Sequence, residues 1–342
     1  MKTFEIHGST GKSTIQVGEK LENLAKYLPT QDVVIITDIN LKHFYQKKFP
    51  PHPMITINTG EQIKNLETVR YIYEKLVEIG ADRSTFIVGI GGGIVCDITG
   101  FVASTYLRGV RFGFIASTLL SQVDASVGGK NGVNFKGYKN IVGVFNQPEF
   151  VICDLELLKT LPEKELLSGF AEIVKHAVIG DVHLFEYLEK HYQKALALDM
   201  EVIEKLVYDS IIIKSGIVNR DEMEKGERRK LNFGHTFGHA MENTAGVLHG
   251  EAVSAGMVMA CALSVKRGHL SEKHFERIER LLQKLGLPVR LQAHKKAVLD
   301  ALQKDKKRKG DRIYFVLLHE IGNSYVRQIP IRELADLTHD FF

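Results

Sequence analysis

Short apolar runs, bounded by polar or glycine-rich segments, divide the first half of the chain. They predict buried β-strands over residues 33–37, 54–58, 85–90, 112–116 and 150–153. Helical patterns separate several of these runs, and the clearest cover residues 61–80 and 94–104. Strands that alternate with helices predict a mostly parallel sheet with helices on its faces.

The pattern changes after Pro162 to an apolar repeat of about 3.6 residues, which predicts successive helices. These helices are expected over residues 163–180, 183–196, 200–219, 228–245, 250–267, 272–285 and 294–303. One hairpin is expected near the end, from Ile313–Leu318 and Ser324–Ile329.

The length of 342 residues exceeds the usual size of a single hydrophobic core, so two domains are expected. The first is predicted to be an α/β, Rossmann-like nucleotide-binding domain over residues 1–158. The second, over residues 159–342, is predicted to be an all-α domain apart from that hairpin, and to bind metal and substrate.

Charge and cysteine usage narrow the class of protein. The 45 basic and 41 acidic residues are spread along the chain, whereas nucleic-acid binders cluster their basic residues on one face. The three cysteines have no paired spacing, which favours reduced thiols. No apolar run approaches the ~18 residues of a membrane helix, and no secretory signal opens the chain. We therefore expect a soluble, cytoplasmic protein with no membrane or nucleic-acid partner.

A glycine cluster, Gly89–Gly93, follows one predicted strand and precedes a predicted helix. Glycines at such a turn let the backbone approach a diphosphate, and the N-terminus of the helix favours an anion. Ile94 takes the third glycine position of the standard dinucleotide motif, and a tight turn is the alternative interpretation. Four glycines in five residues favour nucleotide binding.

Two other glycine-containing segments each have a simpler interpretation that competes with phosphate binding. Gly8–Ser13 resembles a phosphate loop, but Ile6 stands where that motif needs glycine, so a hairpin turn is expected, followed by an exposed strand at Ser13–Val17. Ser126–Asn134 surrounds Lys130 with three glycines. A polar surface loop is one interpretation, and an anion- or substrate-binding loop is the one we favour.

Three histidines and a glutamate predict a metal centre in the second half. His235 and His239 are four residues apart, on one face of a predicted helix, and His249 follows ten residues later. Glu172 and Lys175 lie on adjacent turns of another predicted helix. Two or three histidines with a carboxylate suit a catalytic zinc site with an open position. The spacing alone leaves open which of His235 and His239 is a ligand and which a base.

Basic residues accompany this cluster at Lys214 and at residues 228–230. Each alone is typical of a solvated surface, but beside a metal centre they favour an anionic substrate. The run at residues 304–309 is, by its charge pattern, a solvated surface.

Six segments, taken in order, resemble the 3-dehydroquinate synthases, a family of sugar phosphate cyclases. The resemblance covers most of the chain, from about residue 33 to 320. The segments are Gly91–Asp97 (GGGIVCD), Ala103–Arg111 (ASTYLRGVR), Asp124–Asn134 (DASVGGKNGVN), Gly169–Lys175 (GFAEIVK), Asn232–Ala240 (NFGHTFGHA) and His249–Val253 (HGEAV). Cys96 departs from the pattern, because the family usually has glycine there.

The resemblance implies a lyase of the shikimate pathway of aromatic amino acid biosynthesis that uses NAD and one divalent metal, zinc or cobalt. The implied substrate is a sugar-acid phosphate, 3-deoxy-D-arabino-heptulosonate 7-phosphate. The implied reaction oxidises one hydroxyl transiently through NAD, eliminates phosphate, returns the hydride and closes the ring of 3-dehydroquinate by an intramolecular aldol step. A homodimer is also implied, in which Arg108 reaches the phosphate of the neighbouring subunit.

The resemblance also assigns roles within the metal cluster. It implies that Glu172, His235 and His249 hold the metal, and that His239 is a non-ligand that aids proton movement near the phosphate.

Further positions follow from the same resemblance. Those that match substrate contacts are Lys130, Lys175, Lys214, Arg228, Asn140, Asn232 and Lys306, which reverses the solvated interpretation of the last run. Asp124 matches a position between metal, substrate and cofactor, and Glu224 one near the substrate. The positions that match NAD contacts are Asp38, Asn40, Glu61, Lys64, Gly92, Gly93, Asp97, Ser117, Thr118, Lys139, Thr160, Leu161 and Glu165.

Three alternatives remain at this point. Another sugar phosphate cyclase would act on a phosphate without a carboxylate, whereas Arg228, Lys214 and Asn232 together suit an acid. A metal-dependent polyol dehydrogenase would release NADH and need fewer phosphate-binding cations. A regulatory nucleotide-binding protein would have no use for three metal ligands.

Overall fold

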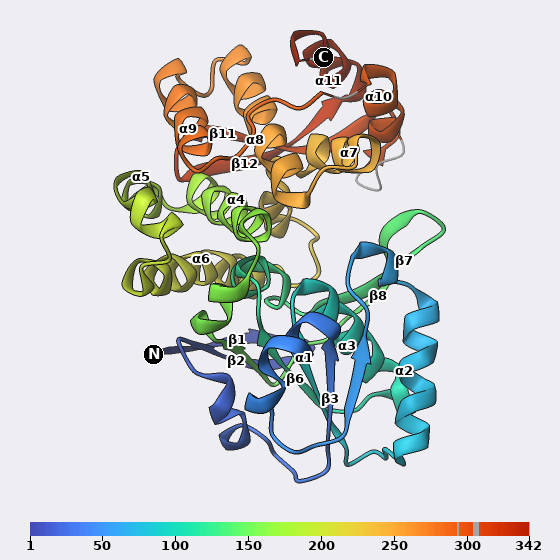
Figure 1. The fold of residues 1–342 in the computed structure, drawn as a ribbon. Coiled ribbons are helices and arrows are strands. Elements are labelled where there is room, and N and C mark those ends of the chain that lie inside the picture. The colour runs from blue at the N-terminus through green and yellow to red at the C-terminus, as the bar shows by residue number, and fades with distance from the viewer. Residues whose placement is uncertain (293, 304–307, 342) are drawn as a thin grey trace. The chain divides into compact units, whose positions relative to one another are not determined.

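The computed structural model describes residues 1–292, 294–303 and 308–341, which form two compact units. The first unit is Met1–Leu161 and the second is Pro162–Phe342. Figure 1 shows the first in blue to green and the second in green to red.

A seven-stranded sheet forms the centre of the first unit, in the order β1-β2-β9-β6-β5-β3-β4. Every neighbouring pair is parallel except β1 and β2. The strands are β1 (Lys2–Gly8), β2 (Gly11–Val17), β3 (Val33–Asp38), β4 (Met54–Ile57), β5 (Phe86–Gly91), β6 (Phe112–Ala116) and β9 (Phe150–Cys153). The five strands predicted from apolar runs are confirmed. Every residue of β3, β5, β6 and β9 is buried, as in parallel sheets covered on both faces.

Three α-helices connect these strands: α1 (Ile39–Tyr45), α2 (Leu66–Ile79) and α3 (Gly93–Thr105). Shorter helical turns are η1 (Leu21–Lys26), η2 (Gln46–Lys48), η3 (Glu61–Ile63), η4 (Tyr106–Arg108), η5 (Ser121–Ala125) and η6 (Leu155–Thr160). The helix predicted over residues 61–80 begins only at Leu66, because the Asn65 side chain accepts the Thr68 N–H and caps it. Gly80, in the left-handed region, ends it.

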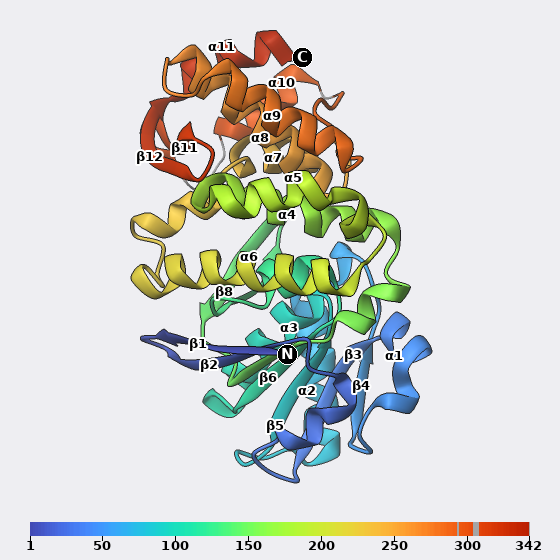
Figure 2. The same ribbon diagram turned by 90° about the vertical axis from the view of Figure 1, so that its left-hand side faces the viewer.

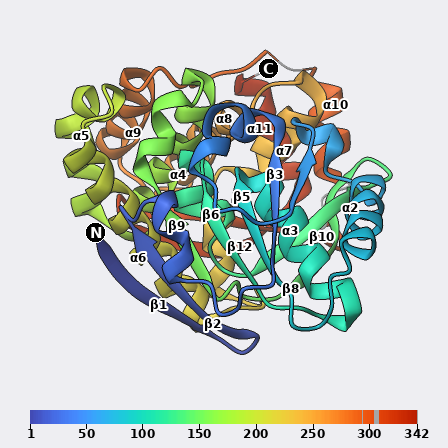
Figure 3. The ribbon, with the colours of Figure 1, turned by 60° about the horizontal axis from the view of Figure 1, so that its bottom comes forward.

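The N-terminal hairpin confirms one prediction and corrects another. Gly8 pairs with Gly11 at a tight turn, as expected for a hairpin. The following strand is not exposed, since Ser13, Ile15 and Val17 on β2 are buried. The reason is its place in the sheet, where β2 pairs with β9 and leaves β1 at the edge (Figure 3).

The glycine-rich segment 126–134 is only partly a loop. Its second half begins β7 (Lys130–Phe135), which pairs in antiparallel register with β8 (Tyr138–Phe145). Gly132 and Gly143 face each other in this pair, and a Cβ on Gly143 would lie 2.4 Å from the Asn131 carbonyl oxygen. In the sequence the glycines suggested a loop, whereas in the structure Gly132 and Gly143 let two strands approach each other closely.

The second unit is helix-rich, and α4, α5 and α6 pack on one another (Figure 2). The helices are α4 (Glu163–Gly180), α5 (Val182–Leu196), α6 (Met200–Arg220), α7 (His235–Ala245), α8 (His249–Lys266), α9 (Glu272–Lys284), α10 (Lys295–Gln303) and α11 (Ile331–Phe341). The predicted hairpin is present as β11 (Arg312–Glu320) and β12 (Asn323–Pro330), which β10 (Arg308–Lys309) extends to three strands. The sheet makes the unit helix-rich rather than entirely helical.

Two helix predictions need correction. The single helix expected over residues 228–245 is a 3-10 turn, η7 (Glu227–Asn232), followed by α7. Gly234 separates them with a φ of 76°, which a continuing right-handed helix excludes. The last helix, α11, was not predicted.

In the described part of the chain, no helix is both long and apolar enough to cross a bilayer.

Candidate metal centre and nucleotide loop

The strand order of the first unit creates a switch point between β3 and β5. After β3, the chain places β4 next to one edge of β3 and then returns to place β5 next to the other edge of β3. In open α/β sheets, ligands bind beyond the carboxyl ends of the strands at such a point. Asp38 ends β3 and Gly91 ends β5, so two of the predicted nucleotide segments flank the switch point.

Close packing explains the glycines at the end of β5. A Cβ on Gly92 would lie 2.9 Å from Thr118 Cγ2, and one on Gly93 would lie 2.9 Å from Ala125 Cβ. The Ser117 N–H donates to the Gly91 carbonyl at 2.9 Å, which joins this loop to the end of β6. No side chain caps the N-terminus of α3. Gly92, Gly93, Ser117 and Thr118 therefore lie together beside a helix N-terminus that suits an anion.

A polar network joins several predicted positions of the first unit. The Lys64 ammonium donates to Asp97 on α3 and, at 2.5 Å, to Asn140 Oδ1 on β8. Asn134 Oδ1 accepts the Asn140 N–H at 2.9 Å, and Asn134 Nδ2 donates to Glu61 Oε1 at 2.7 Å. Asn140, assigned to substrate by the resemblance, thus contacts Lys64, which is assigned to NAD. The resemblance implies no role for Asn134, although this residue of β7 is hydrogen-bonded both to Asn140 and to Glu61.

Asp38 already has a structural partner. Its side chain accepts the N–H groups of Asn40 and Leu41, both at 2.9 Å, and so caps α1. Burial raises the pKa of Asp38, and these two hydrogen bonds oppose that shift. The remaining predicted positions of the unit lie on its loops and hairpin. They are Asp124 in η5, Lys130 at the start of β7, Lys139 on β8, Thr160 at the end of η6, and Leu161.

Arg108 lies in an unusual turn. Leu107, Arg108 and Gly109 all have positive φ, at 49°, 69° and 117°. All three are exposed. Two consecutive non-glycine residues in the left-handed region store backbone strain, and they hold Arg108 at the surface of the unit.

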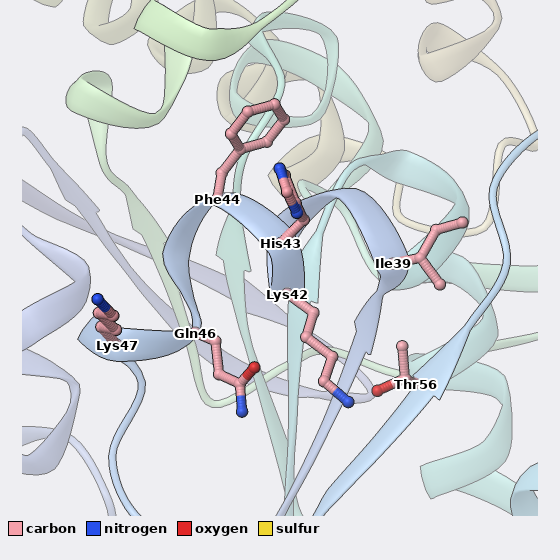
Figure 4. A pocket seen from close by; sticks show the side chains of 7 residues that line it. All are labelled: Ile39, Lys42, His43, Phe44, Gln46, Lys47 and Thr56. Carbon is pink, nitrogen blue, oxygen red and sulfur yellow. The ribbon is translucent and has the colours of Figure 1, made fainter.

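A surface hollow lies beside α1, and one of its lining residues, Ile39, stands between the predicted positions Asp38 and Asn40 (Figure 4). Lys42 and Gln46 leave the helix on one side, and His43 and Phe44 on the other. None of the residues that line it is itself among the predicted site positions.

Three elements of the second unit form the metal cluster. Glu172 lies on α4, His235 opens α7 and His249 opens α8. Their candidate ligand atoms all lie within 4.8 Å of one another. Glu172 Oε1 lies 3.0 Å from His249 Nε2 and 3.6 Å from His235 Nε2, while Glu172 Oε2 faces the Lys175 ammonium. Glu172 and Lys175 are both buried.

Glycines let α7 and α8 approach closely enough to build this cluster. A Cβ on Gly256 of α8 would lie 2.0 Å from the Gly234 carbonyl oxygen and 2.9 Å from the Gly238 nitrogen. A Cβ on Gly238 would lie 3.2 Å from the Ala252 carbonyl oxygen. The glycines of the histidine motif thus bring His235 and His249 side by side, with ring centroids 5.4 Å apart.

The two histidines of the candidate triad, His235 and His249, differ in their protonation. Burial is the main cause that lowers the pKa of His235 to about 4, which keeps this imidazole neutral at pH 7. Burial alone would lower the pKa of His249 too, but its interactions with Glu172 and Glu242 outweigh that effect and raise the pKa to about 10. In the metal-free protein, His249 is therefore a cation held between two carboxylates.

His239 lies beside both histidines, with ring centroids 5.2 Å from His235 and 6.3 Å from His249. Glu242, one turn further along α7, was missed by the sequence reasoning. It forms a second compact group with His239 and His249. A carboxylate three residues after His239 on the same helix was the available signal.

The predicted cations of the second unit have varied surroundings. Lys214 on α6 is buried, and so is Arg228 in η7, whose guanidinium donates to the Glu222 carbonyl. Asn232 Nδ2 donates to Glu224, so these two predicted positions are in contact. Glu165 lies in the first turn of α4. Lys306 lies outside the described residues.

The donor set fits a divalent metal. Two imidazoles and one carboxylate match a catalytic zinc site with an open position. The nucleotide loop fits a dinucleotide as well, because Gly92 and Gly93 leave no side chain between the α3 N-terminus and an incoming diphosphate.

Comparison with known proteins agrees with this architecture. The fold is that of the sugar phosphate cyclases. A solved 2-deoxy-scyllo-inosose synthase, complexed with carbaglucose-6-phosphate, NAD⁺ and Co²⁺, has a TM-score of 0.89, is 25% identical, and is matched over 100% of both chains. A 2-epi-5-epi-valiolone synthase from Streptomyces hygroscopicus, with NAD⁺ and Zn²⁺ bound, has a TM-score of 0.88 and is 26% identical, over 100% of this chain and 99% of that one.

The sequence comparisons are more specific. Residues 54–168 match the family described as 3-dehydroquinate synthase N-terminal, and residues 169–308 match 3-dehydroquinate synthase C-terminal. A 3-dehydroquinate synthase of Thermoanaerobacter pseudethanolicus is 41% identical over 325 residues, 92% of this chain and 91% of that protein. The chain belongs to the 3-dehydroquinate synthase family, so the resemblance noted in the sequence is confirmed.

Proposed function

We propose that this protein is a 3-dehydroquinate synthase, which converts 3-deoxy-D-arabino-heptulosonate 7-phosphate into 3-dehydroquinate and phosphate. The observation that carries the proposal is the cluster of Glu172, His235 and His249, in a chain that also has a nucleotide-type loop at Gly92 and Gly93. Membership of the family supplies the substrate and the reaction class.

Glu172, His235 and His249 would hold one divalent metal, zinc or cobalt, and the loops of the first unit would hold NAD. When bound, the metal supplies a Lewis acid and NAD a reversible hydride acceptor. His235 suits its role because it is already neutral. The Lys64–Asp97 pair would fix the end of the NAD loop, since both groups are held by hydrogen bonds before any ligand arrives.

Buried cations of the second unit would bind the substrate's carboxylate and phosphate. Lys175, Lys214 and Arg228 are nearly inaccessible to water, and a charge in such surroundings attracts an anion more strongly than an exposed one does. Asn232, held by Glu224, would position a hydroxyl. Fixing the substrate at several points lowers the entropic part of the barrier.

His239 is the proposed proton-transfer group. It lies next to the ligand histidines but outside the Glu172 triad, and its imidazole is partly accessible. A partly exposed imidazole can exchange protons with the departing phosphate or with water. Its replacement by alanine is expected to lower turnover by about 10²- to 10⁴-fold while the metal stays bound.

A homodimer with a shared site is part of the proposal. The strained turn at Leu107 and Arg108 supports it, because both residues are exposed there and Arg108 is accessible to a neighbouring subunit. Mixing inactive Arg108→Ala and Glu172→Gln subunits tests the idea. If Arg108 acts on the neighbouring subunit, mixed dimers contain one complete site and regain activity. Lack of recovery in dimers verified by light scattering would contradict it.

The cytoplasm is the proposed location. It is supported by three cysteines, Cys96, Cys153 and Cys261, all of them buried and free of disulfides.

Substrate choice separates this proposal from another sugar phosphate cyclase. The purified protein, supplied with NAD and zinc, would be offered the seven-carbon sugar-acid phosphate, sedoheptulose 7-phosphate or glucose 6-phosphate. Phosphate release only from the acid is expected, because the buried cations need a second anion on the substrate. Faster release from a sugar lacking the carboxylate would assign the chain to another cyclase.

A further inference from the structure

The imidazole of His249 is approached by a carboxylate at each of its two nitrogens. Nε2 lies 3.0 Å from Glu172 Oε1, inside the proposed metal site. Nδ1 lies 3.6 Å from Glu242 Oε2, on the opposite edge of the ring. Glu242 comes from α7, whereas His249 is the first residue of α8. The close approach of these helices through Gly238 and Gly256 makes the contact possible.

His235 has an equivalent arrangement with a different acceptor. Its Nδ1 lies 3.0 Å from the Phe233 carbonyl oxygen, and its Nε2 faces Glu172 Oε1. Both histidines thus have an acceptor at Nδ1 and leave Nε2 to face the same carboxylate oxygen. An acceptor at one ring nitrogen fixes the tautomer and the ring orientation, and it raises the basicity of the other nitrogen.

We propose that Glu242 is a positioning residue of the metal site, which holds the Nδ1–H tautomer of His249 and directs Nε2 at the metal. This inference rests on the proposed metal site. Glu242 differs from the Phe233 carbonyl because it is a charged group. It therefore also adds negative charge next to a dication, with only 12% of its side chain exposed to solvent.

A second interpretation of the same atoms is a ligand role. Glu242, His239 and His249 also form a compact group, so Glu242 could belong to a second ion site. The orientation of His249 favours positioning, because one imidazole cannot present both nitrogens as neutral ligands to two ions without losing its N–H proton. Metal stoichiometry separates the two interpretations.

The test compares Glu242→Gln, Glu242→Asp and the unchanged full-length protein. Glutamine retains the size and one acceptor but loses the charge, whereas aspartate retains the charge on a shorter side chain. Glu189→Gln is the matched control, because Glu189 pairs with Arg277 between α5 and α9 and contacts none of the ligands. The zinc dissociation constant is measured by chelator competition, and the visible spectrum of the Co²⁺ form reports on the ligand geometry.

We expect one equivalent of zinc to bind, with an affinity lowered about 10- to 100-fold in Glu242→Gln and partly restored in Glu242→Asp. The Co²⁺ spectrum should shift in Glu242→Gln and stay unchanged in Glu189→Gln. If the zinc affinity and the Co²⁺ spectrum are both unchanged in Glu242→Gln, the positioning role is overturned but the metal site is not. Two zinc equivalents, one of them lost in Glu242→Gln, would make Glu242 a ligand instead. Absence of zinc binding by the unchanged protein would overturn the metal site itself, and this inference with it.

Discussion

The two units assemble their functional groups by different routes. In the first unit, the groups lie on segments that follow parallel strands, and neighbouring strands bring them together. In the second unit, Glu172, His235 and His249 come from three separate helices that must pack closely. The first arrangement follows from the order of strands, which apolar runs reveal. The second depends on how helices approach, which no single segment encodes.

Both units bury an ion pair, but to different degrees. The side chains of Lys64 and Asp97 in the first unit are 6% and 17% exposed, whereas those of Lys175 and Glu172 in the second are 1% and 0% exposed. Burying an ion pair has a desolvation cost that its own attraction often does not offset. A buried ion pair beside two histidines is typical of a functional site rather than of a contact that only stabilises the fold.

The largest expected effect comes from Glu172→Gln. It removes the proposed charged ligand with little change in size, and turnover should fall roughly 1000-fold or more, since Lewis-acid stabilisation contributes several kcal/mol. Circular dichroism serves as the folding control, and kcat is measured with excess zinc. Turnover within tenfold of the unchanged protein would remove Glu172 from the metal site.

Asp97→Asn is the corresponding change in the first unit. It leaves the buried Lys64 ammonium without its ion-pair partner, so the KM for NAD should rise roughly 10- to 100-fold. Zinc affinity should remain the same, because the proposed metal ligands belong to the other unit. An equal loss of zinc affinity would contradict the assignment of Asp97 to NAD binding alone.

The packing of α7 on α8 can be tested with two glycines. Gly256→Ala places a Cβ against the Gly234 carbonyl and should lower the free energy of unfolding by about 1–3 kcal/mol. Gly216→Ala is the matched control within α6, where the nearest neighbour of a Cβ is Arg220 Nη1 at 3.5 Å. Gly216→Ala should leave the free energy of unfolding unchanged or raise it by up to about 1 kcal/mol, because alanine favours the helix more than glycine does. Urea unfolding measures both, and equal effects would refute the role assigned to Gly256.

A more gradual effect is expected in the pH dependence of zinc binding. His249, with its pKa raised to about 10, must lose a proton when the metal binds, whereas His235 is already neutral above a pKa of about 4. Affinity should therefore rise about tenfold per pH unit between about pH 6 and 8. Chelator competition at several pH values measures the slope. A flat profile would show that His249 is not a ligand.

The same proton affects the stability of the metal-free protein. A pKa raised above the unfolded value stabilises the fold below about pH 6.5, and this contribution is lost as the pH rises through about 10. Thermal unfolding of the chelated protein should therefore occur at lower temperature at pH 9 than at pH 7, a difference that Glu242→Gln should reduce.

The sequence predicted the parallel sheet well, because buried strands such as β3 and β5 are uninterrupted apolar runs. It missed the β7–β8 hairpin, since its glycines are equally typical of loops. It also joined η7 to α7, because the helical period continues across Gly234 and only its backbone conformation reveals the break.

The candidate site shows the same limit. The residues alone grouped His249 and Glu172 with the histidine pair, which was visible as a four-residue spacing. The family resemblance then implied that His235, and not His239, is the ligand of that pair. Glu242 was overlooked because its relation to His249 depends on the crossing of two helices. The contacts of the motif's glycines bring α7 onto α8, and these contacts also depend on the crossing of the two helices.

Phosphate release from 3-deoxy-D-arabino-heptulosonate 7-phosphate tests the central claim most directly. The purified protein is assayed with substoichiometric NAD, before and after chelation, while NADH absorbance is followed in the same cuvette. We predict many phosphates released per NAD, no accumulation of NADH, and loss of release on chelation with recovery on adding zinc or cobalt. Stoichiometric NADH without phosphate would instead assign the chain to a dehydrogenase and contradict the account.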